Sequence, residues 1–215
     1  MHGDWDEYIS FANDNSTGIA TIKFSDTGSP PEITILSSTN GIDESWQPYD
    51  LTSDITLTSY GDRVFLKAET TNEKFASDDA NYWKFVLVNN VAANGNIMSL
   101  LSGESTSNSL AEKQWCFYKL FNGCNTLTKA PELPAITLES DCYREMFANC
   151  TSLKMINVAF SEWEPSTATT NWLQNAGTNV SETTFNCPND LDTSIRSNDT
   201  IPEDTATHVW NIVQS

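Results

Sequence analysis

Two segments of this chain repeat one pattern of side chains. CFYKLFNGCNTLT occupies residues 116–128, and CYREMFANCTSLK occupies residues 142–154. A shift of 26 residues superimposes identical or like-shaped residues: Cys116 on Cys142, Phe117 on Tyr143, Phe121 on Phe147, Cys124 on Cys150 and Leu127 on Leu153. A period in the twenties is typical of a solenoid, in which each coil buries its apolar face only when a neighbour stacks on it. We therefore expect these side chains to lie in register on successive coils of one interior.

Weaker copies of the pattern flank the two clear ones. They include Leu101 upstream and Trp172, Leu173 and Asn175 downstream. SEWEPSTATTNWLQNAG and TTFNCPNDL follow the second copy and are expected to close the array as a terminal cap. The array is therefore short, with two clear coils between two degraded ones.

The residues of one coil predict a short helix followed by an extended segment. Cys142, Met146, Phe147 and Cys150 are spaced by four, one and three residues, which places them on one face of a helix. SLKMINV, which follows them, is typical of a strand. In the preceding coil the two prolines of APELP limit strand pairing to a few residues.

Residues 8–92 are typical of an antiparallel β-sandwich. Short strand-like stretches alternate with clusters of Asn, Asp, Gly, Ser and Pro: YISFA, IATIKF, EITILSS, DITLTS, RVFLKAE and YWKFVLVNN. We find no convincing amphipathic helix before residue 108, and we expect a positive φ at Gly61 in SYGDR. The pattern changes near Ala93 to Gly95, which predicts a β-sandwich domain over 1–93 and a solenoid domain over 94–215.

Charge and hydropathy exclude several classes of partner. The chain has 29 acidic and 11 basic residues, a formal charge of -18 that repels the phosphates of nucleic acids and anionic membrane surfaces. No stretch approaches the roughly 18 to 20 consecutive apolar residues that span a bilayer, so membrane insertion is not expected. MHGDWDEYISF at the N-terminus has no basic region followed by an apolar one, so we expect no secretory signal in it.

No pattern in the sequence predicts a catalytic site. His2 and His208 are the only histidines, and no Gly-x-Ser-x-Gly elbow accompanies either of them. Glycoside hydrolysis needs only two carboxylates, but no acidic pair stands in an apolar surround. We therefore expect no enzyme activity and no cofactor.

The cysteines and the acidic loops predict no metal site. Four of the five cysteines belong to the repeat, and we expect them to be buried thiols that pack as small apolar side chains. A disulfide across coils is an alternative, whereas zinc would need Cys-x2-Cys spacing and histidine ligands. An EF-hand in NDNSTGI is excluded because Phe24 stands where the bidentate Glu is needed. Asp190, Asp192 and Asp199 could bind calcium, but a solvated loop is the simpler interpretation.

Aromatic residues in polar stretches are the candidate binding residues. Trp46 in DESWQPYD and Trp163 in SEWEPST lie in loop-like sequence, and Tyr49 is close to the first of them. Amphipathic rings of this kind serve as contact anchors. The alternative is that each ring folds over its own loop. Trp83, in contrast, alternates with Phe85 and is expected to be in the core.

The repeated segment resembles a known family. CFYKLFNGCNTLTKAPELPAITLESDCYREMFANCTSLK is similar to the BspA-like leucine-rich repeats of surface proteins from gut Bacteroides, which have units of the form Cys-Tyr-x-x-Met-Phe-x-x-Cys-x-Ser-Leu-x-x-Ala-Pro-Glu-Leu-Pro. The likeness is strongest over 92–158. One departure is that the second copy has INVAF in place of APELP. The resemblance implies a β-rich α+β chain, with an antiparallel β-sandwich followed by a short capped leucine-rich repeat solenoid.

The same resemblance implies a role in cell adhesion. We expect a non-catalytic binding module at the cell surface or outside the cell, with a host or bacterial surface protein or a glycan as partner. The alternative is a decoration, fibre or tail protein of a phage virion that infects such bacteria, which an oligomer of threefold or higher symmetry in solution would favour. An enzyme acting on polysaccharides is the third hypothesis.

Overall fold

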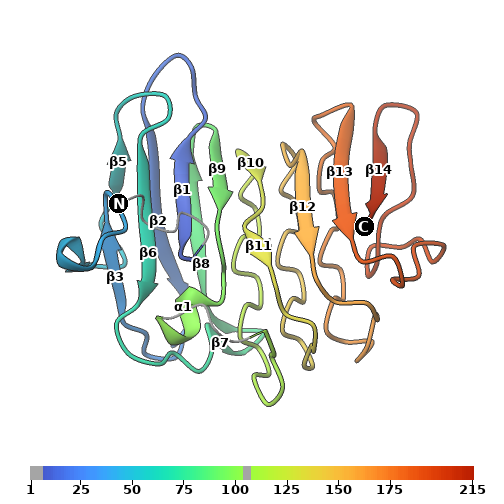
Figure 1. Cartoon of the computed structure of the whole chain (residues 1–215), viewed down its shortest axis with the longest axis horizontal. Helices are drawn as coiled ribbons and strands as arrows, with labels where there is room; N and C mark the ends of the chain where they lie inside the picture. Colours follow the sequence, from blue (N-terminus) through green and yellow to red (C-terminus); the bar gives the residue numbers. More distant parts are fainter. Residues whose placement is uncertain (1–6, 104–107) are drawn as a thin grey trace.

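The chain combines antiparallel sheets with stacked coils (Figure 1). The computed structural model describes residues 7–103 and 108–215, so His2 lies outside the described residues. The fold is β-rich, as predicted, and in the described part of the chain helix is confined to η1 (Asp43–Ser45) and α1 (Ser99–Ser102). No helix among the described residues is long and apolar enough to cross a membrane.

Two sheets, which we call sheet A and sheet B, are formed by the N-terminal half together with one strand of the first coil. Sheet A has the order β10 (Leu127–Lys129), β9 (Val91–Asn94), β1 (Ile9–Asn13), β6 (Arg63–Ala68), β3 (Ile35–Ser38), β4 (Gln47–Pro48). Sheet B has the order β5 (Ile55–Leu57), β2 (Ala20–Thr27), β8 (Asn81–Val88), β7 (Ala76–Asp78). The six predicted strands are confirmed as β1, β2, β3, β5, β6 and β8, and the positive φ at Gly61 is confirmed at 84°.

The two sheets bury their alternating apolar side chains against each other. In β2 the residues Ala20, Ile22 and Phe24 are buried while their neighbours are not, because successive side chains of a strand point to opposite faces. Phe85 of β8 lies between the sheets, with its ring centroid 4.1 Å from that of Phe24 and 4.8 Å from that of Phe11 in β1. We refer to residues 7–94 as the two-sheet region.

Beyond the two-sheet region the chain adds parallel strands one coil at a time. These strands form a sheet with the order β11 (Glu132–Leu133), β12 (Met155–Val158), β13 (Glu182–Cys187), β14 (Val209–Gln214). All three pairings are parallel. A polar ladder crosses the sheet, in which Asn157 Nδ2 donates to Glu132 at 2.8 Å and Asn186 Nδ2 donates to Asn157 Oδ1 at 2.5 Å. The stacking is that of a β-solenoid.

The other side of each coil is a series of turns, and the predicted helix is wrong. Alternate N–H groups donate within the coil to the carbonyl three residues earlier, as Leu120 does to Phe117 at 3.2 Å. The N–H groups between them donate to the next coil, as Phe121 does to Met146 at 3.0 Å. Every fourth residue has a positive φ, for example 54° at Lys119. We call this arrangement the turn ladder.

The rings of the two clear repeats stack, which confirms the predicted register. Phe121 and Phe147 lie 5.4 Å apart with an angle of 17° between their planes, and Phe117 and Tyr143 lie 6.1 Å apart at 15°. The upstream copy does not follow the 26-residue shift. Val91 of β9, and not Leu101, lies beside Leu127.

All five cysteines are buried and free, so the predicted burial of the thiols is confirmed. Cys116 Sγ lies 3.9 Å from the carbonyl oxygen of Cys142 one coil on. Burial raises the pKa of the Cys124 thiol to about 12, and the same cause raises the pKa values of Cys116 and Cys150. The thiolate is the reactive form, so these groups act as apolar packing.

The stretch expected to be a terminal cap forms a third coil instead. Asn149 N–H donates to the carbonyl of Gln174 at 2.7 Å, which continues the turn ladder into residues 167–177. The cap is the following segment, residues 188–208, which leads into β14. One continuous cluster of buried residues runs from the two-sheet region to Trp210, so the domain boundary near residue 94 stays a prediction.

Candidate functional site

The three predicted binding residues do not form one site. Trp46 and Tyr49 flank β4 at one edge of sheet A, whereas Trp163 follows β12 among the coils. Trp46 is half-buried, with its ring centroid 4.9 Å from that of Tyr8 and with Lys67 Nζ 4.5 Å from its own centroid. Its Nε1 has no acceptor among the described residues.

Tyr49 and Trp163 are tied to their own surroundings. The Tyr49 hydroxyl donates to the carbonyls of Leu51 and Ser53 at 3.2 and 2.7 Å, and burial raises its pKa. Trp163 Nε1 donates to the carbonyl of Asp192 at 2.8 Å, and its ring packs 6.1 Å from that of Trp172. A role for these residues in binding remains a prediction.

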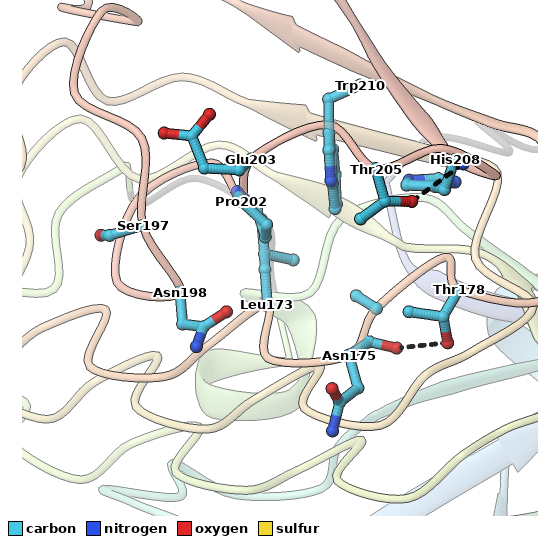
Figure 2. A pocket seen from close by; sticks show the side chains of 11 residues that line it. Leu173, Asn175, Thr178, Ser197, Asn198, Pro202, Glu203, Thr205, His208 and Trp210 are labelled. Carbon is cyan, nitrogen blue, oxygen red and sulfur yellow. Dashed lines mark hydrogen bonds between the residues drawn. The ribbon is translucent and has the colours of Figure 1, made fainter.

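A pocket of about 450 Å³ lies between the third coil and the cap (Figure 2). Leu173 and Ala176 of the third coil supply apolar lining, and Trp210 at the start of β14 lines it from the side. The remaining lining residues are mostly neutral and polar: Asn175, Thr178, Ser197, Asn198, Pro202, Glu203, Thr205 and His208. A volume of this size suits a small ligand or a short segment of a larger one.

Arg196 and Asp204 hold the cap segment that forms the outer wall of the pocket. Arg196 Nη2 donates to the carbonyl of Pro202 at 2.7 Å and to Asp204 Oδ1 at 3.0 Å. The same Asp204 oxygen accepts the N–H of Trp210 at 2.8 Å, and the N–H of His208 donates to Thr205 Oγ1 at 3.1 Å. These contacts preorganise the wall, which reduces the ordering cost of binding.

The turn ladder ends at the pocket. In the third coil the N–H of Leu173 still donates to the carbonyl of Asn198 at 3.4 Å, and that of Asn171 to Asp199 Oδ1 at 2.6 Å. The N–H of Asn175 is the next donor in the series, and it has no acceptor among the described residues. Asn175 Nδ2 donates back to Asn149 Oδ1 of the second coil at 2.9 Å.

His208 borders the pocket as a buried side chain with one backbone partner. Its side chain is only 3% exposed, and Nδ1 lies 2.8 Å from the carbonyl oxygen of Val180. A carbonyl can only accept, so Nδ1 carries a proton and donates it to Val180. No donor among residues 7–103 and 108–215 reaches Nε2. The histidine is thus oriented by its backbone partner.

The acidic loop residues are engaged in loop structure. Asp199 Oδ1 accepts the N–H of Asn171, and Asp192 Oδ1 accepts the N–H and the hydroxyl of Ser194 at 2.9 and 2.6 Å. Within the described ranges, no group of three or more His, Cys, Asp or Glu side chains is placed to hold a metal ion.

One sequence feature points to the pocket, namely the third-coil copy of the repeat at Leu173 and Asn175. The cap residues that complete it, such as Pro202 and Thr205, belong to no repeat and could not be placed from spacing. Searches against family models, curated proteins and solved structures each return no match for this chain.

Proposed function

We propose that this chain is a non-catalytic binding module, built on a short BspA-like leucine-rich repeat solenoid, which recognises a protein or glycan at a cell surface. The pocket between the third coil and the cap is the proposed binding site. The support for a leucine-rich repeat is the repeated sequence together with its stacked coils. The support for binding is the pocket itself.

The observation that carries the proposal is a preformed pocket lined by exposed, neutral polar side chains. Asn175, Thr178 and Ser197 are exposed and offer hydrogen-bonding groups, whereas the apolar lining residues Leu173 and Ala176 are already buried, at 0% and 2% exposed. Polar groups placed in this way fix the orientation of a bound ligand and supply specificity. Nδ1 of His208 donates to a backbone carbonyl, and Nε2 has no hydrogen-bond partner among the described residues, so no hydroxyl or thiol in that part of the chain is paired with this ring.

The test is a paired screen of one glycan array and one displayed peptide library. Thr178 is an exposed lining residue, so Thr178→Trp should obstruct the pocket and weaken any ligand bound there. Gln174 is exposed on the same coil but does not line the pocket, so Gln174→Trp is the matched control. A ligand that is lost with Thr178→Trp, kept with Gln174→Trp and recovered chemically unchanged supports the proposal. A failure to find such a ligand in both screens, or the recovery of a cleaved one, contradicts it.

A further inference from the structure

The last strand of the solenoid sheet, β14, has an open edge (Figure 1). β14 pairs with β13 on one side, and no strand among the described residues pairs with its other side. The N–H groups of Val209 and Ser215 donate toward β13, at 3.0 and 3.1 Å. Because the bonded residues alternate along a strand, Ile212 and Gln214 direct their N–H and C=O groups the other way. No hydrogen-bond partner within 7–103 and 108–215 meets these four groups.

β14 differs from every other edge strand of the three sheets. The strands at the other edges are β4, β5, β7, β10 and β11, and each has two or three residues. β14 has six residues, VWNIVQ, with no charged side chain and no proline. Proteins normally protect an edge with a short strand, charged side chains or proline, because an unprotected edge can pair with another extended chain. β14 has none of these protections.

Contacts with the cap hold both ends of β14 in place. At its start, Asp204 Oδ1 accepts the N–H of Trp210 at 2.8 Å, so the cap closes the edge at that residue. At its end, Gln214 Nε2 donates to the carbonyls of Asn189 and Leu191, both at 3.1 Å. The open part of the edge is therefore preorganised, which reduces the ordering cost of pairing.

The surroundings of β14 are acidic. Residues 182–215 contain six acidic residues, all of them exposed, and one basic residue, Arg196. Arg196 already pairs with Asp204 at 3.0 Å. The uncompensated carboxylates attract a positively charged partner. They also repel a second copy of this chain, whose β14 carries the same surroundings.

We propose that the open edge of β14 binds an extended, positively charged segment of another protein, which joins the sheet as a fifth strand. The backbone of this segment pairs with the N–H and C=O groups of Ile212 and Gln214. Val213 is 40% exposed and packs beside a β-branched side chain of the segment. Ile212, Val213 and Gln214 do not line the pocket, so this is a second binding surface that does not rest on the proposed function.

The test is selection of a displayed library of random dodecapeptides on the full chain. Val213→Lys places a positive charge at the edge. Val88→Lys is the matched control, because Val88 is 50% exposed and lies in β8, an inner strand of sheet B. We expect enriched peptides to combine β-branched residues with Lys or Arg. They should bind Val213→Lys at least about tenfold more weakly than the wild type or Val88→Lys, a loss of about 1.4 kcal/mol.

Nuclear magnetic resonance of the ¹⁵N-labelled chain locates the contact. When an enriched peptide binds, the backbone amide proton of Ile212 should move downfield because it gains an acceptor. The amide proton of Val209 already donates to the carbonyl of Ser181 at 3.0 Å, so its resonance should stay in place.

The outcomes separate this inference from the proposed function. Peptides that are lost with Val213→Lys and kept with Thr178→Trp support it, provided that the Ile212 amide proton moves. An unmoved Ile212 amide proton, an absence of enrichment, or enriched peptides without positive charge overturn it. Peptides lost with Thr178→Trp and kept with Val213→Lys bind the pocket instead, which supports the proposed function and overturns the inference. A dimer of the full chain that Val213→Lys dissociates overturns it in favour of a second copy.

Discussion

At the scale of the residue, the turn ladder requires positive φ angles at residues other than glycine. Lys119, Glu145 and Asn171 occupy one such position in successive coils, with φ of 54°, 53° and 53°. The left-handed conformation costs roughly 1–2 kcal/mol for a residue with a Cβ atom. Lys119 and Glu145 offset part of this cost through an ion pair of 3.4 Å.

Gly123 and Gly177 both have a positive φ, but an added Cβ atom would clash with its neighbours only at Gly177. Gly177 has a φ of +72°, and a Cβ there would lie 2.4 Å from Thr183 Oγ1 and 2.7 Å from His208 Cε1. Gly123 has a φ of +79° with nothing within 4 Å of the same atom. We expect Gly123→Ala to lower the free energy of unfolding by about 1 kcal/mol and Gly177→Ala by about 2–4 kcal/mol. Urea denaturation of both variants measures the difference, and equal losses would contradict the packing around Gly177.

Residue properties could be predicted where one local rule decides. Gly61 stands in a turn sequence, and only glycine adopts its φ of 84° without strain, so that prediction held. The positive φ of Lys119 gives no such signal, because tertiary hydrogen bonds impose it against the preference of the residue. The polar residues next to Trp163 in the sequence do not indicate its surroundings either. The rings that pack around it come from Phe160, Trp172 and Phe185.

At the scale of the element, strands were predictable and the turn ladder was not. Alternation in β2 or β8 has a period of two that only a strand satisfies. In the coils, inward residues such as Met146 and Cys150 recur every four positions, which over two turns cannot be told from the 3.6-residue period of a helix. The hydrogen bonds that distinguish the turn ladder from a helix join residues 25 apart, as from Phe147 to Trp172. Local sequence patterns do not predict such bonds.

Glycine and alanine at Asn171 should distinguish a turn ladder from a helix. With a φ of 53°, position 171 should favour Gly over Ala by about 1 kcal/mol. A helix would favour Ala over Gly by about the same amount, so the sign of the difference is decisive. Gln174 is exposed and has no positive φ, so Gln174→Gly should be no more stable than Gln174→Ala. Thermal or urea unfolding of the four variants gives the comparison, and a more stable Asn171→Ala would contradict the ladder.

At the scale of the whole molecule, the two-sheet region acts as the first cap of the solenoid. β10 extends sheet A beyond β9 with a parallel pairing, so that sheet leads into the stacked strands. On the other side, the N–H groups of Phe75 and Phe85 donate to the carbonyls of Cys116 and Leu120 at 2.9 and 2.7 Å. In the first coil of the turn ladder, the carbonyls of Cys116 and Leu120 thus accept hydrogen bonds from β8 and from the residue that precedes β7. Solenoids need such a cap because a terminal coil otherwise exposes its interior.

Unfolding should therefore couple the two halves of the chain. Phe121 is fully buried, with its ring 5.0 Å from that of Phe85 in β8 and 5.4 Å from that of Phe147 in the next coil. Phe121→Ala should lower the free energy of unfolding by about 3–5 kcal/mol. Because the cavity lies between the two-sheet region and the coils, hydrogen exchange should accelerate in β8 and in β12 together, within a single calorimetric transition. Tyr60 is 67% exposed, so Tyr60→Ala is the control and should leave both strands protected. Faster exchange in β12 with unchanged protection in β8 would instead mean that residues before and after 94 unfold as separate domains. In that case the packing of Phe121 against Phe85 would not couple their unfolding.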